Sequence, residues 1–363
     1  MSMKVFLAGG GTSGHIHPAT AIADELKKQD PNTEILFCGT AKGLESQIIP
    51  AQGYAFEVIR ASQLPMKPSK KTFTAIKDFR AGKKMCRKLI REQKPDAVIG
   101  TGGFVCSPLI AAAHKEKVPI LLHEQNAFPG RSNRLMSRYA KTVCTSFPGI
   151  EHYFNKKAKI VYTGNPIRGV FANVDHVSCR AQLGLQEDEF LILAMGGSLG
   201  ARTVNEAIVE LAKQCTDPKV KIILSVGKQR YKEVMEEAKN WPKSIQVFEY
   251  IQNPEVYLAA CDLFIGRAGA ITCAEVQAVG APSVLIPYPY AAQDHQTYNA
   301  KTFEDANAGV LLPDAQAVEK LPGIVMELMG NKEKLDVMRK KTQELAIYDA
   351  AERIVKEVRA LGK

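Results

Sequence analysis

The sequence has little of what secreted and metal-binding proteins use to stabilise their folds. Its eight cysteines are scattered along 363 residues, with no Cys-x-x-Cys pair and no histidine-rich cluster beside any of them. This spacing argues against a disulfide framework and against a zinc site, and it indicates buried thiols in a reducing compartment.

The sequence also lacks a long hydrophobic run. Met1 to Gly10 leads directly into a strand-like segment and has no apolar core of a signal peptide. The longest uncharged stretch, Ala97 to Ala113, is interrupted by three glycines and a proline and is short for a membrane span. We therefore expect a protein at the cytoplasmic face of the cell membrane whose membrane contact is peripheral.

Positive charge is in excess, and one segment carries the excess. The net charge is +10, and the segment from Arg60 to Lys94 contains 12 Lys and Arg residues against two acids. Charge concentrated in this way indicates a partner rather than a feature of the fold.

The basic segment begins as a proline-containing loop and continues with a helical pattern. Its partly apolar stripe consists of Ile76, Phe79, Lys83, Cys86, Leu89 and Ile90. A basic amphipathic helix beside an apolar loop is typical of a protein that rests on anionic lipid, and a solvated helix is the alternative. RNA binding would need an aromatic platform or a known module, so we expect no nucleic acid partner.

Strand-like apolar runs alternate with helical patterns in both halves of the chain. The expected strands are Lys4–Ala8, Glu34–Cys38, Phe56–Ile59, Ala97–Ile99, Ile120–His123 and Thr142–Cys144, then Phe190–Met195, Lys221–Ser225, Gln246–Phe248, Leu263–Ile265, Ser283–Ile286 and Val310–Leu312. Helical patterns fall between them, for example at Ala19–Gln29 and Lys77–Glu92. This alternation predicts an α/β fold with two doubly wound, Rossmann-like domains of parallel strands.

The periodicity breaks near Gly164–Val174, which places the domain boundary there. We expect an N-terminal domain at residues 1–165 and a C-terminal domain at 166–345, with a last helix in 346–363 packing back on the first domain. Two such domains facing each other leave a cleft between the carboxyl ends of their sheets.

Each half opens with a strand that runs into glycines. Gly9 to Gly14 matches the dinucleotide pattern G-x-G-x-x-G, but the second strand ends in Phe37-Cys-Gly-Thr40 without the acid that binds a ribose. Gly196 to Gly200 matches the nucleophile elbow G-x-S-x-G, but Asp294 and His295 are adjacent, which suits separate triad loops poorly. Backbone amides that cradle a phosphate explain both loops better.

Seven motifs, in order over both halves, resemble one family. They are Gly10-Gly-Thr-Ser-Gly-His-Ile-His-Pro18, Gly100-Thr-Gly-Gly-Phe104, His123-Glu-Gln-Asn126, Gly164-Asn-Pro-Ile-Arg168, Gly196-Gly-Ser-Leu-Gly-Ala201, Arg267-Ala-Gly-Ala-Ile-Thr-Cys-Ala-Glu275 and Asp294-His-Gln-Thr-Tyr-Asn299. The chain resembles the MurG family, the UDP-N-acetylglucosamine:N-acetylmuramyl-(pentapeptide) pyrophosphoryl-undecaprenol N-acetylglucosaminyltransferases, over essentially its full length. Ser13 stands where that family usually has another glycine.

The resemblance implies the glycosyltransferase B fold, with the nucleotide sugar in the C-terminal domain and the lipid acceptor in the N-terminal domain. It implies no cofactor and no bound metal, and no Asp-x-Asp stands at a strand end to hold one. Helix N-termini and backbone amides would then meet the diphosphate charge.

The resemblance also implies the contacts to UDP-N-acetylglucosamine. Glu275 matches the acid that takes the ribose hydroxyls, with a solvent-facing helix acid as the alternative. Arg168 suits a phosphate or sugar, and a structural salt bridge is its rival. The remaining donor contacts are Thr12, Ser13, Gly14, Asn126, Ser198, Ile251, Ala270, Ile271, Thr272, Cys273, Ala274, Gln296 and Asn299.

Inversion at the anomeric carbon requires a base in the cleft. His15, at the end of the first glycine loop, is the favoured candidate because histidine titrates near neutral pH, and Glu124 is the other. A histidine that only orders the loop remains the alternative for His15. The acceptor diphosphate is expected at Gly11, Thr12, Gly14, Gly102 and Gly103.

The resulting interpretation is inverting transfer of N-acetylglucosamine to the undecaprenyl-diphosphate-linked muropeptide of peptidoglycan synthesis. A related glycolipid transferase, a UDP-sugar epimerase of the same fold, a dinucleotide oxidoreductase and a non-catalytic sensor of sugar nucleotides are the alternatives. The peptide stem of the acceptor, the oligomeric state and the extent of domain closure are left open by the sequence.

Overall fold

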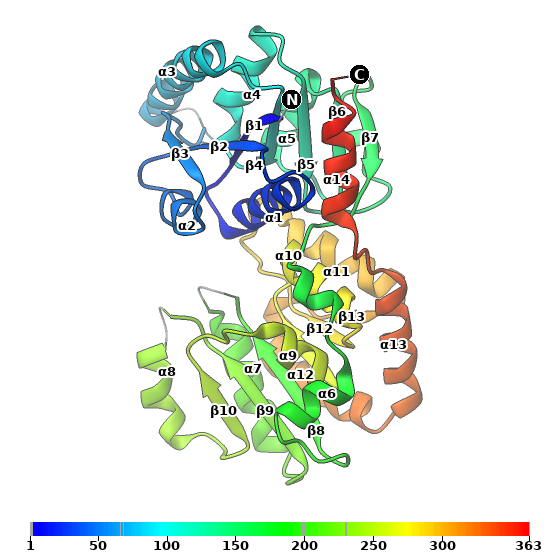
Figure 1. The fold of residues 1–363 in the computed structure, drawn as a ribbon. Coiled ribbons are helices and arrows are strands. Elements are labelled where there is room, and N and C mark those ends of the chain that lie inside the picture. Colours follow the sequence, from blue (N-terminus) through cyan, green and yellow to red (C-terminus); the bar gives the residue numbers. More distant parts are fainter. Residues whose placement is uncertain (1–2, 66, 68, 198–199, 229–230, 363) are drawn as a thin grey trace. The chain divides into compact units, whose positions relative to one another are not determined.

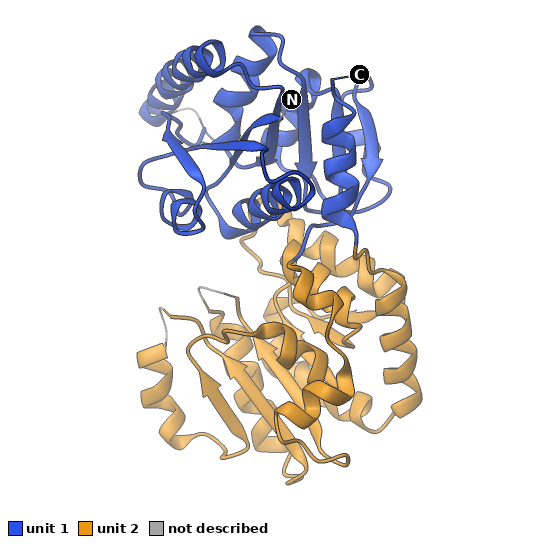
Figure 2. Ribbon diagram, viewed as in Figure 1, with its two compact units in different colours: residues 1–167, 349–363 blue, residues 168–348 orange. Residues whose placement is uncertain are grey.

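The computed structural model describes residues 3–65, 67, 69–197, 200–228 and 231–362. The chain forms two compact units (Figure 2). The first unit comprises Met1–Ile167 and Asp349–Lys363, and the second comprises Arg168–Tyr348. Among the described residues, no helix combines the length and the apolarity that crossing a bilayer requires.

The first unit contains a seven-stranded parallel sheet of order β3-β2-β1-β4-β5-β6-β7 (Figure 1). Its strands are β1 (Lys4–Gly9), β2 (Glu34–Gly39), β3 (Ala55–Val58), β4 (Ala97–Gly102), β5 (Ile120–Glu124), β6 (Thr142–Thr145) and β7 (Lys159–Tyr162). Its helices are α1 (Ser13–Gln29), α2 (Glu45–Ala51), α3 (Lys70–Gln93), α4 (Cys106–Lys115), α5 (Arg131–Met136) and α14 (Ala350–Arg359), with 3-10 turns at Ser137–Tyr139 and Glu151–Tyr153.

Alternation along β1 explains the layers of this unit. Val5 and Leu7 face one hydrophobic cluster, which α1 and α14 complete, whereas Phe6 and Ala8 face a second cluster formed with α3 and α4. A parallel sheet covered on both faces is apolar at consecutive positions, so β1 is buried from Val5 to Gly9.

The C-terminal helix α14 belongs to the first unit although the chain reaches it last. Ile354, Val355 and Val358 are buried in the cluster with α1, and each apolar side chain buried in this way contributes about 1.5–3 kcal/mol. An ion pair between Lys159 and Glu357, 2.7 Å long, ties α14 to β7.

The second unit contains a six-stranded parallel sheet of order β10-β9-β8-β11-β12-β13. Its strands are β8 (Phe190–Met195), β9 (Val220–Ser225), β10 (Ile245–Phe248), β11 (Leu263–Gly266), β12 (Ser283–Leu285) and β13 (Gly309–Leu311). Its helices are α6 (His176–Gln182), α7 (Arg202–Gln214), α8 (Tyr231–Glu237), α9 (Pro254–Ala260), α10 (Ala270–Val279), α11 (His295–Asp305), α12 (Ala317–Met329) and α13 (Lys332–Glu344), with 3-10 turns at Gly169–Ala172, Ala238–Asn240, Ala292–Asp294 and Asp314–Gln316.

The predicted α/β class with doubly wound parallel sheets is confirmed, and every expected strand is present, with ends that agree within one residue except at β4, which continues three residues beyond the expected Ile99. Strand β7 was not predicted, because it is four residues long and lies at the sheet edge with all of its residues at least partly exposed. The glycine loops follow β1, β4 and β8, and the turn Arg267–Gly269 follows β11. All four therefore lie at carboxyl ends of parallel strands, the edge at which α/β proteins bind ligands.

Candidate functional site

The first glycine loop leads from β1 into α1. Thr12 is the N-cap of this 17-residue helix, it makes no side-chain capping bond, and the first turn carries no acid. The first amides of a helix have no partner within the helix, and its dipole is positive at this end. The start of α1, at Ser13 and Gly14, is therefore suited to an anion.

A buried carboxylate, that of Glu45, holds this loop by accepting hydrogen bonds. Glu45 is fully buried, and its Oε2 accepts the N–H of Gly11 at 3.1 Å. Its Oε1 accepts both the backbone N–H and the hydroxyl of Thr40, at 3.1 and 2.7 Å. The amide of Gly11 is thus engaged with Glu45 in this structure, so among the predicted diphosphate contacts of this loop the geometry favours Thr12 and Gly14.

Gly102 and Gly103 let the second loop pack closely on the first. Their φ angles are +110° and +78°. A Cβ on Gly102 would lie 2.9 Å from the His15 ring, and one on Gly103 would lie 2.2 Å from the carbonyl oxygen of Gly10. Close packing therefore accounts for both glycines, whether or not their amides also meet a phosphate.

His15 lies in the first turn of α1, half-buried against Gly102. Its Nδ1 is 2.9 Å from Oε1 of Gln125, whose Nε2 is 2.9 Å from Nδ1 of His123. The Nε2 of His123 is in turn 3.1 Å from the carbonyl oxygen of Gly164. Burial lowers the pKa of His123 to about 4, so this inner histidine is neutral at neutral pH.

Glu124, the other candidate base, is buried and fully hydrogen-bonded. Its Oε1 accepts the backbone and side-chain N–H groups of Asn126, at 3.0 and 3.2 Å. Its Oε2 accepts from the amide of Gly130 at 3.1 Å and from the side chain of Asn133 at 2.9 Å. Both oxygens of Glu124 are thus occupied in holding the loop after β5, so the geometry favours His15 over Glu124 as the base.

In the second unit, α10 repeats the open helix start. Gly269 is its N-cap without a side-chain bond, and the first turn carries no acid. The predicted segment Ala270–Cys273 forms this first turn, and Ala274 follows it. The buried side chain of Asn299 donates to the carbonyl of Ala268 at 3.0 Å, so in this structure it holds the turn before α10.

Glu275 lies in the second turn of α10 and is half-buried. Burial raises the pKa of its carboxyl to about 7, the nearby Arg168 lowers it and Glu255 raises it. Arg168 forms a 2.9 Å ion pair with Glu255 and lies over the ring of Phe171. The structural salt bridge that was the alternative role for Arg168 is thus present. The guanidinium of Arg168 is still close enough to Glu275 to affect its pKa.

The remaining predicted donor contacts are dispersed over the second unit. Ile251 is buried just after β10, and Ile271 and Thr272 are partly exposed in the first turn of α10. The side-chain oxygen of Gln296 accepts the N–H of Tyr288 at 2.9 Å. Ser198 lies outside the described residues.

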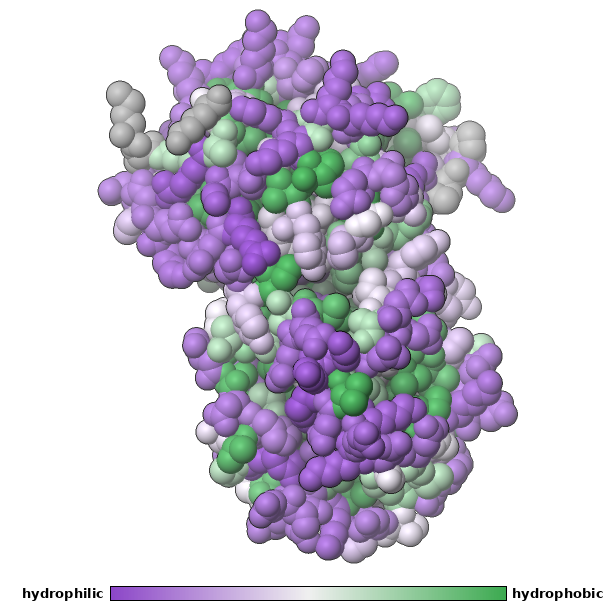
Figure 3. All heavy atoms as spheres, turned by 90° about the vertical axis from the view of Figure 1, so that its right-hand side faces the viewer, coloured by the Kyte–Doolittle hydropathy of each residue, from purple (hydrophilic) through white to green (hydrophobic). Residues whose placement is uncertain are grey.

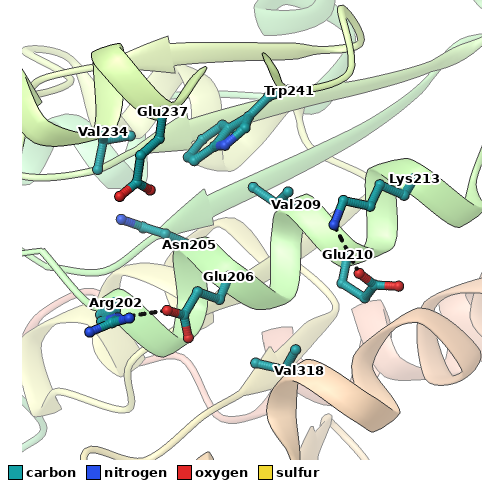
Figure 4. A pocket seen from close by; sticks show the side chains of 10 residues that line it. All are labelled: Arg202, Asn205, Glu206, Val209, Glu210, Lys213, Val234, Glu237, Trp241 and Val318. Atoms are coloured by element: carbon teal, nitrogen blue, oxygen red, sulfur yellow. Dashed lines mark hydrogen bonds and ion pairs between the residues drawn. The ribbon is translucent and has the colours of Figure 1, made fainter. Parts of the chain in front are cut away.

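A groove of about 300 Å³ is present elsewhere on the second unit. Figure 4 shows it between α7, α8 and α12, lined by Arg202, Asn205, Glu206, Val209, Glu210, Lys213, Val234, Glu237, Trp241 and Val318. It contains none of the predicted site residues.

The basic segment forms a loop and then α3. The buried residues of α3 are Ala75, Gly82, Cys86 and Ile90. Ile76 was expected in the apolar stripe but is exposed, as are Phe73 and Leu64. On the opposite side of this unit, which carries α14, hydrophilic side chains predominate and apolar ones form separate patches (Figure 3).

Comparison with known proteins covers the whole chain. Residues 5–145 match the glycosyltransferase family 28 N-terminal domain and residues 191–354 the glycosyltransferase family 28 C-terminal domain. The UDP-N-acetylglucosamine--N-acetylmuramyl-(pentapeptide) pyrophosphoryl-undecaprenol N-acetylglucosamine transferase of Thermoanaerobacter sp. (strain X514) is 41% identical over 364 residues, 99% of this chain and 100% of the relative. The enzyme of the same name from Alkaliphilus oremlandii (strain OhILAs) is 41% identical over 362 residues, 99% of each.

A solved structure supports the same relationship as the sequence comparisons. The crystal structure of Acinetobacter baumannii MurG has a TM-score of 0.80 and 30% identity to this chain, with 99% of each chain covered. The chain belongs to the MurG family. Its two Rossmann-like units are those of the MurG glycosyltransferase B fold.

Other solved structures have the same fold at much lower sequence identity. The UDP-GlcNAc 2-epimerase from Neisseria meningitidis, solved with bound UDP-GlcNAc, has a TM-score of 0.68 at 13% identity, over 99% of this chain and 100% of that one. At this identity the likeness shows the fold alone.

Sequence reasoning missed three polar residues that the structure joins to this MurG-family site: Glu45, His123 and Gln125. Glu45 is five residues beyond the strand end at which an acid was sought. His123 and Gln125 lie two positions apart at the end of β5, so the period of two along a strand places them on one face, opposite Glu124 and Asn126. That alternation within the His123–Asn126 motif was the signal that could have found them.

Proposed function

We propose that this chain transfers N-acetylglucosamine from UDP-N-acetylglucosamine to the C4 hydroxyl of N-acetylmuramic acid in the undecaprenyl-diphosphate-linked muropeptide. One observation carries the proposal: relatives named for this reaction are 41% identical over the full length of both units. The open helix starts at α1 and α10 support it, because donor and acceptor both contain a diphosphate.

In this proposal the donor binds to the second unit around α10. The amides of Ala270–Cys273 and the positive end of the helix dipole stabilise the diphosphate, and Glu275 accepts the two ribose hydroxyls. Arg168 adds positive charge beside Glu275. The other proposed donor contacts are Thr12, Ser13, Gly14, Asn126, Ser198, Ile251, Ala274, Gln296 and, through the turn it holds, Asn299.

The reaction is a single displacement. The acceptor C4 hydroxyl attacks the anomeric carbon on the face opposite UDP, so the configuration inverts. His15 takes the hydroxyl proton, the bond from the anomeric carbon to the diphosphate oxygen breaks, and UDP leaves with the electron pair. The acceptor diphosphate lies at the start of α1, near Thr12 and Gly14, with Gly102 and Gly103 shaping the adjacent loop.

The first unit is proposed to rest on the cytoplasmic face of an anionic membrane through α3 and the loop before it. Phe73 and Ile76 lie one turn apart on α3, are 78% and 41% exposed, and have Lys70, Lys77 and Arg80 as exposed neighbours. Apolar side chains that enter the interface beside cations are the usual anchor of a peripheral protein.

Phe73→Ser with Ile76→Ser should weaken binding to phosphatidylglycerol vesicles in co-sedimentation, whereas Val177→Ser, which changes a residue of the second unit about as exposed as Phe73, should not. Equal vesicle binding by the wild type and the double variant would contradict this role of α3.

The reaction itself is tested by turnover. Labelled UDP-N-acetylglucosamine and a short-chain analogue of the lipid-linked muropeptide, with EDTA present, should yield the labelled disaccharide, and Glu275→Ala should strongly reduce its formation at a donor concentration below the wild-type KM. Absence of product from a protein that still binds UDP would reject this acceptor and favour another glycolipid or epimerase chemistry. Turnover that disappears only with EDTA would reject the metal-free mechanism.

A further inference from the structure

A chain of hydrogen bonds connects His15 to the end of the first unit. It runs from Nδ1 of His15 through the side-chain amide of Gln125 and the ring of His123 to the carbonyl of Gly164, with distances of 2.9, 2.9 and 3.1 Å. Gln125 and His123 are buried, with exposed fractions of 1% and 0%. Each link constrains the next, because a buried donor must meet an acceptor.

The orientation of the Gln125 side-chain amide follows from its contact with a backbone carbonyl oxygen, which can only accept a hydrogen bond. One end of the amide is 3.1 Å from the backbone carbonyl oxygen of His123, in addition to Nδ1 of the same residue. Only an NH₂ group can donate to a carbonyl oxygen, so the nitrogen faces His123 and the oxygen faces His15.

The protonation of the His123 ring follows in the same way. Its Nε2 is 3.1 Å from the carbonyl oxygen of Gly164 and 3.2 Å from the hydroxyl oxygen of Ser146. The carbonyl can only accept, so Nε2 of His123 carries the proton. Its Nδ1 then has the lone pair that accepts the hydrogen bond from Gln125. The contacts of His123 with Gly164 and with Gln125 therefore require the same tautomer.

One assignment remains for His15. Because the oxygen of Gln125 faces its Nδ1, that nitrogen must carry a proton to make the bond. We propose that Gln125 and His123 are positioning residues, which hold the neutral His15 ring as the Nδ1–H tautomer and leave the lone pair on Nε2 to take the acceptor's proton. This inference rests on the proposed role of His15 as the base.

The His15 ring needs neighbours that fix its tautomer and its position. Free neutral imidazole prefers its proton on the other nitrogen, Nε2, and a ring in that form could not accept a proton there. A wrong tautomer is costly, since in serine proteases it lowers the rate by about 10⁴. Gly102 adds a steric constraint, because a Cβ at this position would lie 2.9 Å from the His15 ring, and glycine leaves that space to the ring.

Nuclear magnetic resonance of protein labelled with ¹⁵N-histidine reads the tautomer directly. The ring signals of His15 are assigned by their loss in His15→Gln. In the wild type at a pH where the ring is neutral, we expect Nδ1 of His15 to be the protonated nitrogen and Nε2 the unprotonated one. A proton on Nε2 would overturn the proposal.

Two variants separate positioning from structure. Gln125→Met keeps the length of the side chain but removes its hydrogen bonds to His15 and His123, so the His15 proton should redistribute toward Nε2 and kcat should fall about 10-fold to 100-fold, part of the 10²–10⁴ of a general base. The KM for UDP-N-acetylglucosamine should stay unchanged. Gln125→Glu, buried and protonated on the oxygen that donates to His123, keeps an acceptor oxygen toward His15 and should restore both the Nδ1–H signal and most of kcat.

The outcomes distinguish this inference from the function on which it rests. If His15→Gln turns over normally, His15 is not the base, and the proposed mechanism fails whatever the tautomer. If His15→Gln is inactive but Gln125→Met keeps the wild-type ring signals and kcat, only the positioning role fails. Should Gln125→Met not fold, the wild-type spectrum and the kcat of Gln125→Glu decide the question.

Discussion

Two of the helices that follow glycine turns, α1 in the first unit and α10 in the second, start alike but are surrounded differently. Neither has a side-chain cap or an acid in its first turn, whereas Asp175 caps α6 and Asn331 caps α13. The open start is shared with α4, α5, α7 and α11, so it becomes informative at α1 and α10 only together with the predicted site residues that surround these two helix starts, where a ligand with negative charge can take the place of the cap.

The surroundings give the two starts different chemistry. The α1 loop is fixed to a buried carboxylate, Glu45, and the first turn of α1 presents the imidazole of His15, the candidate base. The second turn of α10 presents Glu275, whose pKa is raised to about 7 by burial. The same backbone device is thus combined with a candidate base in one unit and with a candidate hydroxyl acceptor in the other.

The largest expected effect separates catalysis at α1 from binding at α10. His15→Gln should lower kcat by about 10² to 10⁴, the usual contribution of a general base, while calorimetry should find the affinity for UDP-N-acetylglucosamine unchanged. His17→Gln, an exposed histidine two residues away, is the matched control. A parallel loss of donor affinity in His15→Gln would erase the distinction between the two helix starts.

The converse variant is Glu275→Ala. Loss of a charged hydrogen-bond acceptor costs about 1.5–3 kcal/mol, so the dissociation constant for UDP-N-acetylglucosamine should rise about 10-fold to 150-fold. Glu206→Ala removes an exposed carboxylate elsewhere in the second unit and should leave binding intact. Unaltered calorimetric affinity in Glu275→Ala would leave this carboxylate as a helix acid without a ligand.

The packing of the first unit's loops can be broken at Gly102. Gly102→Ala forces a Cβ within 2.9 Å of the His15 ring at a φ of +110°, and we expect a loss of about 1–3 kcal/mol in unfolding free energy together with a fall in kcat. Gly53→Ala also has a positive φ but meets no atom within 4 Å, so it should cost less stability and no activity. Denaturant titration and turnover of both variants make the comparison.

The smallest expected effect is a pH dependence confined to the second unit. Glu275 binds hydroxyls best as the carboxylate, and with a pKa of about 7 it is protonated below that pH in the free protein. Donor binding should therefore release a proton, and affinity should rise about 10-fold from pH 6 to pH 8 and then level off. The donor's diphosphate, esterified at both ends, does not titrate in this range. Glu275→Gln should give a flat calorimetric profile between pH 6 and pH 8, and a wild-type slope in that variant would assign the titration to another group.

The strands were predictable because parallel strands buried on both faces are continuous apolar runs, as in β1 and β8. The edge strand β7 lacked that signal. Which residues of α3 are buried was harder to predict. Cys86 and Ile90 of the predicted apolar stripe are buried, but so are Ala75 and Gly82, two small residues that carry little hydrophobic signal.

At the site, the chain motifs identified the loops but not their internal bonds. Gly11 donates to Glu45, a contact between residues distant in sequence. Glu124 accepts hydrogen bonds from the loop after β5, and this depends on the local turn geometry. Hydrogen-bond partners of this kind are set by tertiary packing, which no pattern in a single segment encodes.

The late position of α14 in the chain has a consequence for synthesis. About 180 residues of the second unit are translated between the main part of the first unit and the helix that completes its core. At the usual speed of a ribosome this interval lasts on the order of 10–40 s. During that time the apolar side of α1, with Ile22 and Leu26, has no partner from α14, so the first unit to be made is the last to be finished.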